Sequence, residues 1–226
     1  MKLLFDEPNM DLHTHTTHSD GSCLPSDIIH MAKYNGVKVI SITDHDTMDA
    51  YEEIDKEAIR EEGINLIYGV EMSTLYKGHR VHVLGYGIHP RLFKIFKSLY
   101  YKNYAGHQSK YISMKNAKKL IHLLGGKVIL AHPYKYSNFK GKELVESVIK
   151  DNLVDGIECF HSYNSEEEIN TLLKYAIDND LYISAGSDYH NAYRRINEYN
   201  RCCDIGYLDS IKMTIEKCVN KKQKIR

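Results

Sequence analysis

The sequence predicts an α/β fold in which seven strands form a closed or nearly closed TIM-like barrel. Two observations support this prediction. Short, apolar, β-branched segments alternate along the chain with amphipathic segments of helical period, a pattern typical of parallel α/β folds. The chain has 226 residues, of which 42% are hydrophobic and 27% are charged, and no Pro/Gly-rich linker interrupts it. We therefore expect a single globular domain over residues 1–226.

Seven segments have the features of barrel strands. Each is short and rich in apolar and β-branched residues, and a helical pattern separates most of them from the next. This order implies a mainly parallel sheet. The predicted strands are residues 9–13, 37–43, 65–70, 80–84, 127–131, 156–160 and 181–185.

Several other segments have helical periodicity. Three of them stop near Gly36, Gly63 and Gly125, and glycine commonly follows the end of a helix. Ser165 stands before three glutamates, which is typical of a helix N-cap with an acidic first turn. The stretch 90–107, rich in Tyr, Phe and Lys, is predicted to form a helix and a loop over the barrel mouth. The predicted helices are residues 25–34, 49–62, 109–124, 142–151, 165–179 and 208–219.

The composition narrows the classes of function. Lys plus Arg and Asp plus Glu both total 30, so no net field attracts nucleic acid or an anionic membrane, and an anionic substrate needs a local site. No apolar run is long enough to span a bilayer, and residues 1–10 lack the basic start and apolar core of a signal peptide. Five cysteines without paired spacing favour reduced thiols. We expect a cytoplasmic protein with no membrane association and no obligatory protein partner.

Nearly every predicted strand ends in a His, Asp or Glu. The carboxyl ends of parallel strands converge on one mouth of a barrel, so residues far apart in the sequence would meet there. His13 and His15 are two residues apart on an extended segment, which points both side chains to the same side. Asp188 and His190 repeat this spacing. Each pair could therefore bind metal in one region.

The residue types of this cluster indicate the ligand. Imidazoles and carboxylates with few cysteines suit Zn, Mn or Fe rather than a thiolate site. Without a cation, so many carboxylates and histidines in one barrel mouth would be costly through repulsion and desolvation. A single histidine of this kind is more often a surface or core residue. The interpretation depends on the recurrence of His, Asp or Glu at successive strand ends. The sequence therefore predicts two or three divalent ions.

At these residues the sequence resembles the PHP (polymerase and histidinol phosphatase) family of metal-dependent phosphoesterases. The matching segments occur in the family's order from residue 11 to about residue 190. The resemblance implies a distorted (β/α)7 barrel, PHP type, with a trinuclear metal site. The segments are residues 11–15, 19–21, 42–47, 69–71, 81–86, 131–133 and 186–190.

Carried over position by position, the resemblance implies nine metal ligands in three groups. Each group would bind one ion. Glu71 would belong to two groups and bridge their ions. The groups are His13, His15, Glu71 and Asp188; Glu71, His82 and His132; and Asp20, His45 and His190.

The resemblance also implies hydrolysis of a phosphate ester by metal-activated water, without a side-chain nucleophile. The most similar branch includes nucleoside 3′,5′-bisphosphate phosphatases and 5′-to-3′ exonucleases, which usually carry a substantial insertion between the strands of His82 and His132. In this sequence the insertion between these two strands is short and lies around residues 90–126. We expect a phosphate monoester of a small metabolite or nucleotide as substrate. The alternatives are an exonuclease or phosphodiesterase acting on short oligonucleotides, a histidinol-phosphate phosphatase, and a non-catalytic module.

A few residues are candidates for catalysis or substrate binding. His45 and Asp188 would act in catalysis as metal ligands. His161, near a strand end, is a candidate to contact the substrate or protonate the leaving group. Lys135 and Arg194 are candidates to bind phosphate, and the alternative for both is an exposed surface charge.

Two further features have supporting roles in this interpretation. Asp44 and Asp46 flank His45, and Asp11 precedes His13; we expect these carboxylates to orient ligands rather than to bind metal. The Tyr- and Lys-rich stretch around residues 94–104 could bind a base and a phosphate. We favour the alternative, an amphipathic lid that packs on the barrel.

Overall fold

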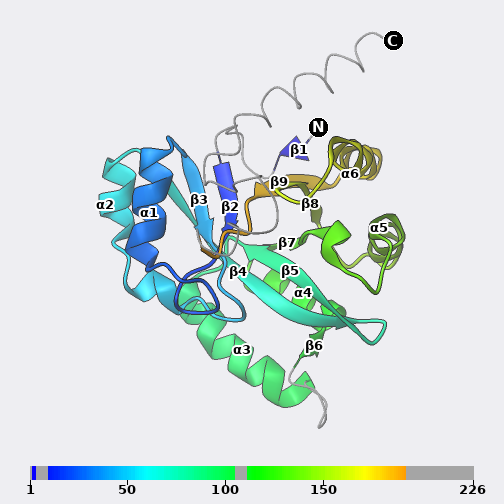
Figure 1. The fold of residues 1–226 in the computed structure, drawn as a ribbon. Helices are drawn as coiled ribbons and strands as arrows, with labels where there is room; N and C mark the ends of the chain where they lie inside the picture. Colours follow the sequence, from blue (N-terminus) through cyan, green and yellow to red (C-terminus); the bar gives the residue numbers. More distant parts are fainter. Residues whose placement is uncertain (1, 4–9, 105–110, 192–226) are drawn as a thin grey trace.

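Residues 2–3, 10–104 and 111–191 are described by the structure, a computed structural model (Figure 1). The predicted helix over residues 208–219 lies outside the described residues. All seven predicted strands are present, together with two short additional ones. The strands are β1 (Lys2–Leu3), β2 (Met10–Thr14), β3 (Val39–Ile42), β4 (Asn65–Tyr76), β5 (His79–Tyr86), β6 (Ile112–Ser113), β7 (Lys127–Leu130), β8 (Gly156–His161) and β9 (Tyr182–Gly186).

The strands form one sheet in the order β1-β9-β8-β7-β5-β4-β3-β2, and β6 pairs with β4. The sheet curls until its two ends meet beside β2 and β9. There the Asp188 N–H donates to the His13 carbonyl at 2.8 Å, and the His15 N–H donates to the Tyr189 carbonyl at 2.8 Å. Seven strands thus make a nearly closed barrel, as predicted.

The mainly parallel order breaks at one hairpin. β5 is antiparallel to both β4 and β7, whereas the other neighbouring pairs are parallel. Lys77 and Gly78 join β4 to β5, with φ angles of 49° and 82°. Two positive φ angles in a two-residue loop define the turn that matches the twist of a β-hairpin. The sequence predicted no helix between these two strands and a mainly parallel sheet, and the hairpin is the place where the sheet departs from the parallel order.

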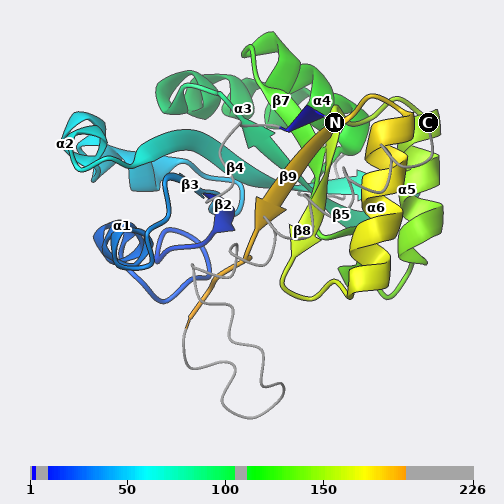
Figure 2. The same ribbon diagram turned by 90° about the horizontal axis from the view of Figure 1, so that it is seen from above.

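Helices cover the outside of the barrel, with α1 and α2 on one side and α5 and α6 on the other (Figure 2). Their apolar faces and the outward side chains of the strands make the core. No described helix is long and apolar enough to cross a membrane. The helices are α1 (Pro25–Tyr34), η1 (Asp49–Glu52), α2 (Lys56–Glu61), α3 (Pro90–Tyr104), α4 (Met114–Leu123), η2 (Pro133–Lys135), α5 (Gly141–Lys150) and α6 (Glu166–Asp178).

Local sequence explains why one predicted helix forms as expected and why another is divided into two. Ser165 caps α6, because its Oγ accepts from the Glu168 N–H while the Glu168 carboxylate accepts from the Ser165 N–H. The helix predicted over residues 49–62 is instead η1 followed by α2. Asp55 divides it, because its Oδ1 accepts from the Glu57 and Ala58 N–H groups and so starts a new helix.

The Tyr- and Lys-rich stretch forms α3, which packs on the barrel through Phe93, Phe96 and Tyr100. None of its described side chains lines the cavity at the barrel mouth. Lys97 of α3 donates to the carbonyl of Asp46, which follows His45, and the loop predicted after this helix, residues 105–107, lies outside the described residues. The polar side chains that line the cavity belong to other elements.

Candidate metal centre

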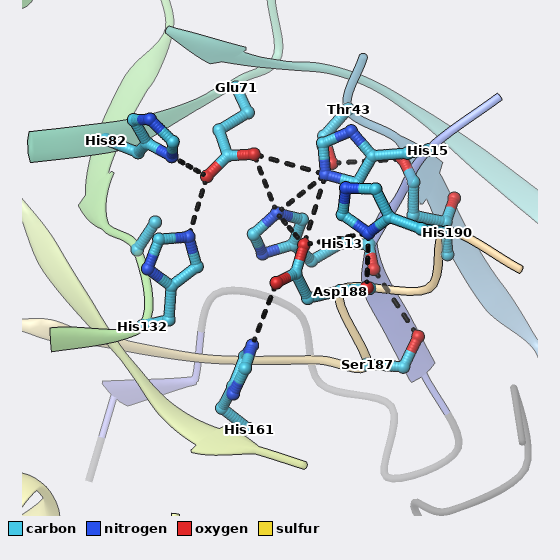
Figure 3. Close-up of polar contacts among 12 residues, drawn as sticks. His13, His15, Thr43, Glu71, His82, His132, His161, Ser187, Asp188 and His190 are labelled. Atoms are coloured by element: carbon cyan, nitrogen blue, oxygen red, sulfur yellow. Dashed lines mark hydrogen bonds and ion pairs between the residues drawn. The ribbon is translucent and has the colours of Figure 1, made fainter. Parts of the chain in front are cut away.

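The nine predicted ligands gather at one mouth of the barrel. All of them except Asp20 and His45 are labelled in Figure 3. A cavity of about 680 Å³ opens there, and seven of the nine line its wall. His13 and His15 lie beneath it, with side chains that are 0% exposed. The structure therefore brings together residues that are spread over most of the described sequence.

Four buried side chains form an inner group: His13, His15, Glu71 and Asp188. The Nε2 atoms of His13 and His15 are 3.1 Å apart, and each lies 3.1 Å from Glu71 Oε2. Asp188 Oδ1 lies 3.3 Å from the His13 nitrogen and 3.2 Å from the His15 nitrogen. Ligands about 2.0 Å from a tetrahedral ion are about 3.3 Å apart. The four atoms are therefore spaced as ligands of a single ion.

The second oxygen of Glu71 serves a second group. Its Oε1 lies 2.9 Å from His82 Nδ1 and 2.9 Å from His132 Nε2. The two imidazole rings are inclined at 73°, with centroids 5.5 Å apart, so they approach this oxygen from different sides. Glu71 thus joins the two groups through its two oxygens, as the predicted bridging role requires.

The outer group, Asp20, His45 and His190, is more open. Asp20 Oδ1 lies 3.2 Å from His190 Nε2, and Asp20 Oδ2 lies 3.5 Å from His45 Nε2. The side chains of Asp20, His45 and His190 are 50%, 25% and 16% exposed. His15 Nδ1 lies 3.5 Å from Asp20 Oδ1, so this group adjoins the inner one.

The backbone that carries the ligands is held in place at the barrel closure. Asp188 follows β9 and has a φ of 55°, while His132 follows β7 with a φ of 27°. Positive φ is uncommon for residues with a side chain and occurs preferentially at functional sites, where surrounding contacts enforce it. Here the Asp188 N–H donates to His13 across the closing seam, which fixes the left-handed residue opposite a second ligand.

His82 reaches the site by a route that the sequence argument did not foresee. It lies inside β5, which is antiparallel, and not at the carboxyl end of a parallel strand. In the β4–β5 ladder His82 pairs with Ser73, and Ser73 lies on the same face of β4 as Glu71 because the two are two residues apart. The structure therefore places His82 beside Glu71 from within a strand rather than from a strand end, and its role as a metal ligand stays a prediction.

Glu158 has a structural role in the site that the sequence analysis did not assign. Its Oε1 lies 2.9 Å from His13 Nδ1, and its Oε2 accepts from the His132 N–H at 2.7 Å. A carboxylate on the far nitrogen of a ligand histidine fixes the ring orientation and raises its basicity. The signal in the sequence was its place in the predicted strand 156–160, just before His161, within the series of acidic and histidine residues.

Other hydrogen bonds hold the supporting backbone. The Tyr136 hydroxyl accepts from the His82 N–H at 2.7 Å. Asp11 Oδ1 accepts from the Ser187 N–H at 2.9 Å, which supports the turn before Asp188. The predicted orienting roles of Asp11 and Asp44 thus act on neighbouring backbone and hydroxyl groups rather than on a ligand ring.

Asp44 stabilises the loop that carries Asp20. Its two oxygens accept from the Thr16 N–H at 2.8 Å and the Thr16 hydroxyl at 2.6 Å, and Oδ1 also accepts from Ser19 Oγ at 2.6 Å. Asp46 instead accepts from the Ser73 N–H at 3.2 Å, across the adjoining strand. Both carboxylates therefore fix backbone near the ligands.

The inner group has an excess of negative charge that shifts the pKa of its members. Burial would lower the pKa of His13, but the three carboxylates around it raise it well above its ordinary value. For His15, hydrogen bonds to Asp188 and Glu71 outweigh burial and raise the pKa to about 9. Although burial opposes it, the imidazoles hold the pKa of Glu71 and that of Asp188 well below their usual range. The carboxylates therefore favour positive charge at the centre of the group.

The donor set fits divalent ions. Burial lowers the pKa of His132 to about 4 and also lowers that of His45, so both imidazoles are neutral at pH 7, the form that binds metal. Buried polar atoms that lack a hydrogen bond are rare in proteins and need a reason. In the described part of the chain, five such atoms belong to residues of this site, and a cation in the inner group would satisfy one of them, Glu71 Oε2. The five atoms are His45 Nδ1, Glu71 Oε2, His82 Nε2, His132 Nδ1 and His161 Nε2.

The remaining candidates are placed differently from one another. Lys135 lines the cavity, and its Nζ donates to the Asp188 carboxylate. The His161 side chain is 0% exposed, and its Nε2 lies 3.6 Å from Asp188 Oδ2. His161 does not line the cavity in this geometry, so its contact with a substrate stays a prediction. Arg194 lies outside the described residues.

Comparisons with known proteins agree with the fold. Residues 11–199 match the PHP domain family. The chain is 27% identical to a 5′-3′ exoribonuclease of Haemophilus influenzae over 80% of this chain and 89% of that protein. It is 25% identical to a 3′,5′-nucleoside bisphosphate phosphatase of Chromobacterium violaceum, over 80% and 87%. The solved structure of an amidohydrolase from the latter organism superposes with a TM-score of 0.70 at 23% identity, over 89% of this chain and 96% of that one.

Proposed function

The chain belongs to the PHP domain family, and we propose that it is a metal-dependent hydrolase that cleaves phosphate monoesters of a small metabolite or nucleotide. One observation carries the proposal. The four inner ligand atoms have the spacing of a metal coordination shell, and their residues line or lie directly beneath a cavity of about 680 Å³. That volume is in the range of small-molecule sites, about 300–1,000 Å³.

The residues of the site have separate parts in this proposal. The nine predicted ligands would hold two or three divalent ions, Mn, Zn or Fe. Such ions lower the pKa of water from about 15.7 towards about 7 and neutralise charge on phosphoryl oxygens. Lys135 extends from the cavity wall to Asp188, so its ammonium group is placed to bind a phosphate oxygen beside the ions. Neither Ser187 nor any other hydroxyl is needed as a nucleophile.

A second candidate function is cleavage of short oligonucleotides as an exonuclease. It is supported by the similarity to relatives named as 5′-3′ exoribonucleases. The same metal chemistry acts on a diester, and the difference lies in what the cavity wall accepts beyond the scissile phosphate. The neutral net charge favours the small substrate over long nucleic acid. A cytoplasmic location is part of the same proposal.

The test is phosphate release from a substrate panel, with Mn²⁺ and with EDTA. The panel contains p-nitrophenyl phosphate, a nucleoside 3′,5′-bisphosphate, histidinol phosphate and a short oligonucleotide. We expect release that EDTA abolishes, and faster turnover of a monoester than of the oligonucleotide. Cleavage of the oligonucleotide alone would support the second candidate. No release from protein that elemental analysis shows to hold metal would contradict the proposal.

A further inference from the structure

We propose that Tyr163 is the platform on which a planar ring of the substrate stacks, so that nucleoside phosphates are preferred over phosphates of aliphatic alcohols. This inference rests on the proposed function, because it names the substrate class of the same cavity. Seven large apolar or aromatic side chains are strongly exposed in the described part of the chain, and only Tyr163 lies in the wall of this cavity. Its side chain is 59% exposed.

Tyr163 is exposed but firmly placed. Its ring stacks on the buried His161 ring, with centroids 5.5 Å apart and planes inclined at 26°. Its N–H also donates to His161 Nδ1 at 3.3 Å. A ring fixed in this way loses little conformational entropy when a ligand stacks on it, which favours binding. One face is covered by His161, so a second planar group can be accommodated only on the remaining exposed surface.

The surroundings of Tyr163 suit a nucleoside phosphate. Lys135 Nζ lies over the Tyr163 ring, 5.6 Å from its centroid, and also contacts Asp188, so a single cation adjoins both the ring and the inner metal ligands. A phosphate bound at Lys135 would therefore place its ester group next to the tyrosine ring. Asn138, exposed in the same wall, offers an amide donor and acceptor for the edge of a base.

The other exposed surface of the cavity is polar, which makes Tyr163 the discriminating contact. The wall consists mainly of charged and hydrogen-bonding side chains, and the second aromatic residue in it, Tyr136, has its hydroxyl committed to the His82 N–H. Stacking on an aromatic side chain is tolerant of the identity of the base. We therefore expect selection for an aromatic ring and little selection among bases.

The experiment compares Tyr163→Ala and Tyr163→Phe with the wild type on adenosine 5′-monophosphate and glycerol phosphate. Binding is measured by calorimetry on Mn²⁺-loaded protein with the phosphonate analogues, in which a methylene replaces the bridging oxygen, and hydrolysis is measured on the esters. Tyr34→Ala is the matched control, because Tyr34 is 91% exposed and lies outside the cavity. Circular dichroism checks that each variant is folded.

We expect Tyr163→Ala to weaken binding of the nucleotide analogue about 5- to 100-fold and to leave binding of the glycerol analogue within about twofold. Tyr163→Phe should retain the nucleotide preference. Equal losses on both ligands would overturn the inference and assign Tyr163 to supporting His161, and so would equal affinity of the wild type for both. Binding that follows the expected pattern without hydrolysis would contradict the proposed function and uphold the stacking site.

Discussion

The inner and outer ligand groups differ in how the fold holds them. The inner residues belong to strands or to the residues next to them, and their side chains are at most 2% exposed. The outer residues belong to loops, and Asp20 is half exposed. Glu158 and the closing seam of the barrel brace the inner group, whereas the loop of Asp20 depends on Asp44 and Ser19.

This difference indicates that the two groups would bind their ions with different strength. The inner carboxylates are buried together, so leaving them without a cation costs the most. The outer group is partly hydrated and can be satisfied by water. We therefore expect the ion of the inner group to be retained during purification and dialysis, and the ion of the outer group to exchange readily.

The largest effect should follow from Glu71→Gln, which removes the charge shared by two groups. We expect the variant to lose both ions that would contact Glu71, and each loss to lower phosphatase activity at least about 100-fold. Substitution of residues that only orient metal ligands already changes activity about 10- to 100-fold. Metal content by elemental analysis and kcat by phosphate release measure this. Glu52→Gln, on the exposed side of η1, is the control. Two ions retained in the variant would refute the bridging role.

His45→Ala probes the outer group, whose residue His45 also lies 3.3 Å from Glu71 Oε2 through Nδ1. The fold should be unchanged because this side chain is 25% exposed, while kcat should fall more than about 100-fold and one ion should be lost. Thermal unfolding, metal content and turnover are measured together. His30→Ala, an exposed helix residue, should match the wild type in all three. Wild-type turnover in His45→Ala would show that the assignment of the outer ion is wrong.

Glu158→Gln tests whether bracing distinguishes the inner group. Glutamine keeps the shape but loses the charge that faces His13 at 2.9 Å. We expect metal affinity and activity to fall about 10- to 100-fold. Titration of metal-free protein with Zn²⁺ measures the affinity. If the affinity for the outer ion falls and the affinity for the inner ion does not, Glu158 does not act through His13.

The sequence predicts the parallel parts of this fold well, because a buried strand followed by a capped helix is a local pattern. The segment that became α1 and the capping box of Ser165 are examples. The Lys77-Gly78 hairpin was missed, since its turn depends on positive φ angles rather than on a hydrophobic period. Tyr51 was missed as well. Its buried hydroxyl accepts from the Ile42 and Gly69 N–H groups and so ties β3 to β4, a contact between distant residues that no local pattern encodes.

The same limit applies to the site. The types of the ligands and their places after strands predict that most of them meet, because parallel strands end at one mouth. The bracing of His13 by Glu158 depends on which face of β8 points inward, and a register irregularity between Glu158 and Phe160 changes that face. The exposure of Tyr163 likewise depends on the packing of its ring against His161.

The smallest effect should come from Asp155→Asn, which lies away from both groups and should change stability alone. Asp155 Oδ2 accepts from the Val128 N–H at 2.8 Å and lies 2.7 Å from His122 Nε2. Partial burial would raise the pKa of Asp155, but these contacts hold it below its ordinary value of 3.8. A lowered pKa in the folded state stabilises the protein above the ordinary value, and this stabilisation is lost as the pH falls through the folded-state pKa.

We therefore expect Asp155→Asn to lower the free energy of unfolding by about 1 kcal/mol at pH 7, with kcat and metal content unchanged. The difference between variant and wild type should shrink as the pH falls below about 4, as measured by urea unfolding at several pH values. Asp178→Asn removes an exposed carboxylate that pairs with Lys174, and should cost no more than about 0.5 kcal/mol. If the difference in free energy of unfolding between Asp155→Asn and the wild type does not change with pH, Asp155 stabilises the fold through its shape and not through its charge. Loss of activity would mean that the braced inner group extends further into the fold than its hydrogen bonds indicate.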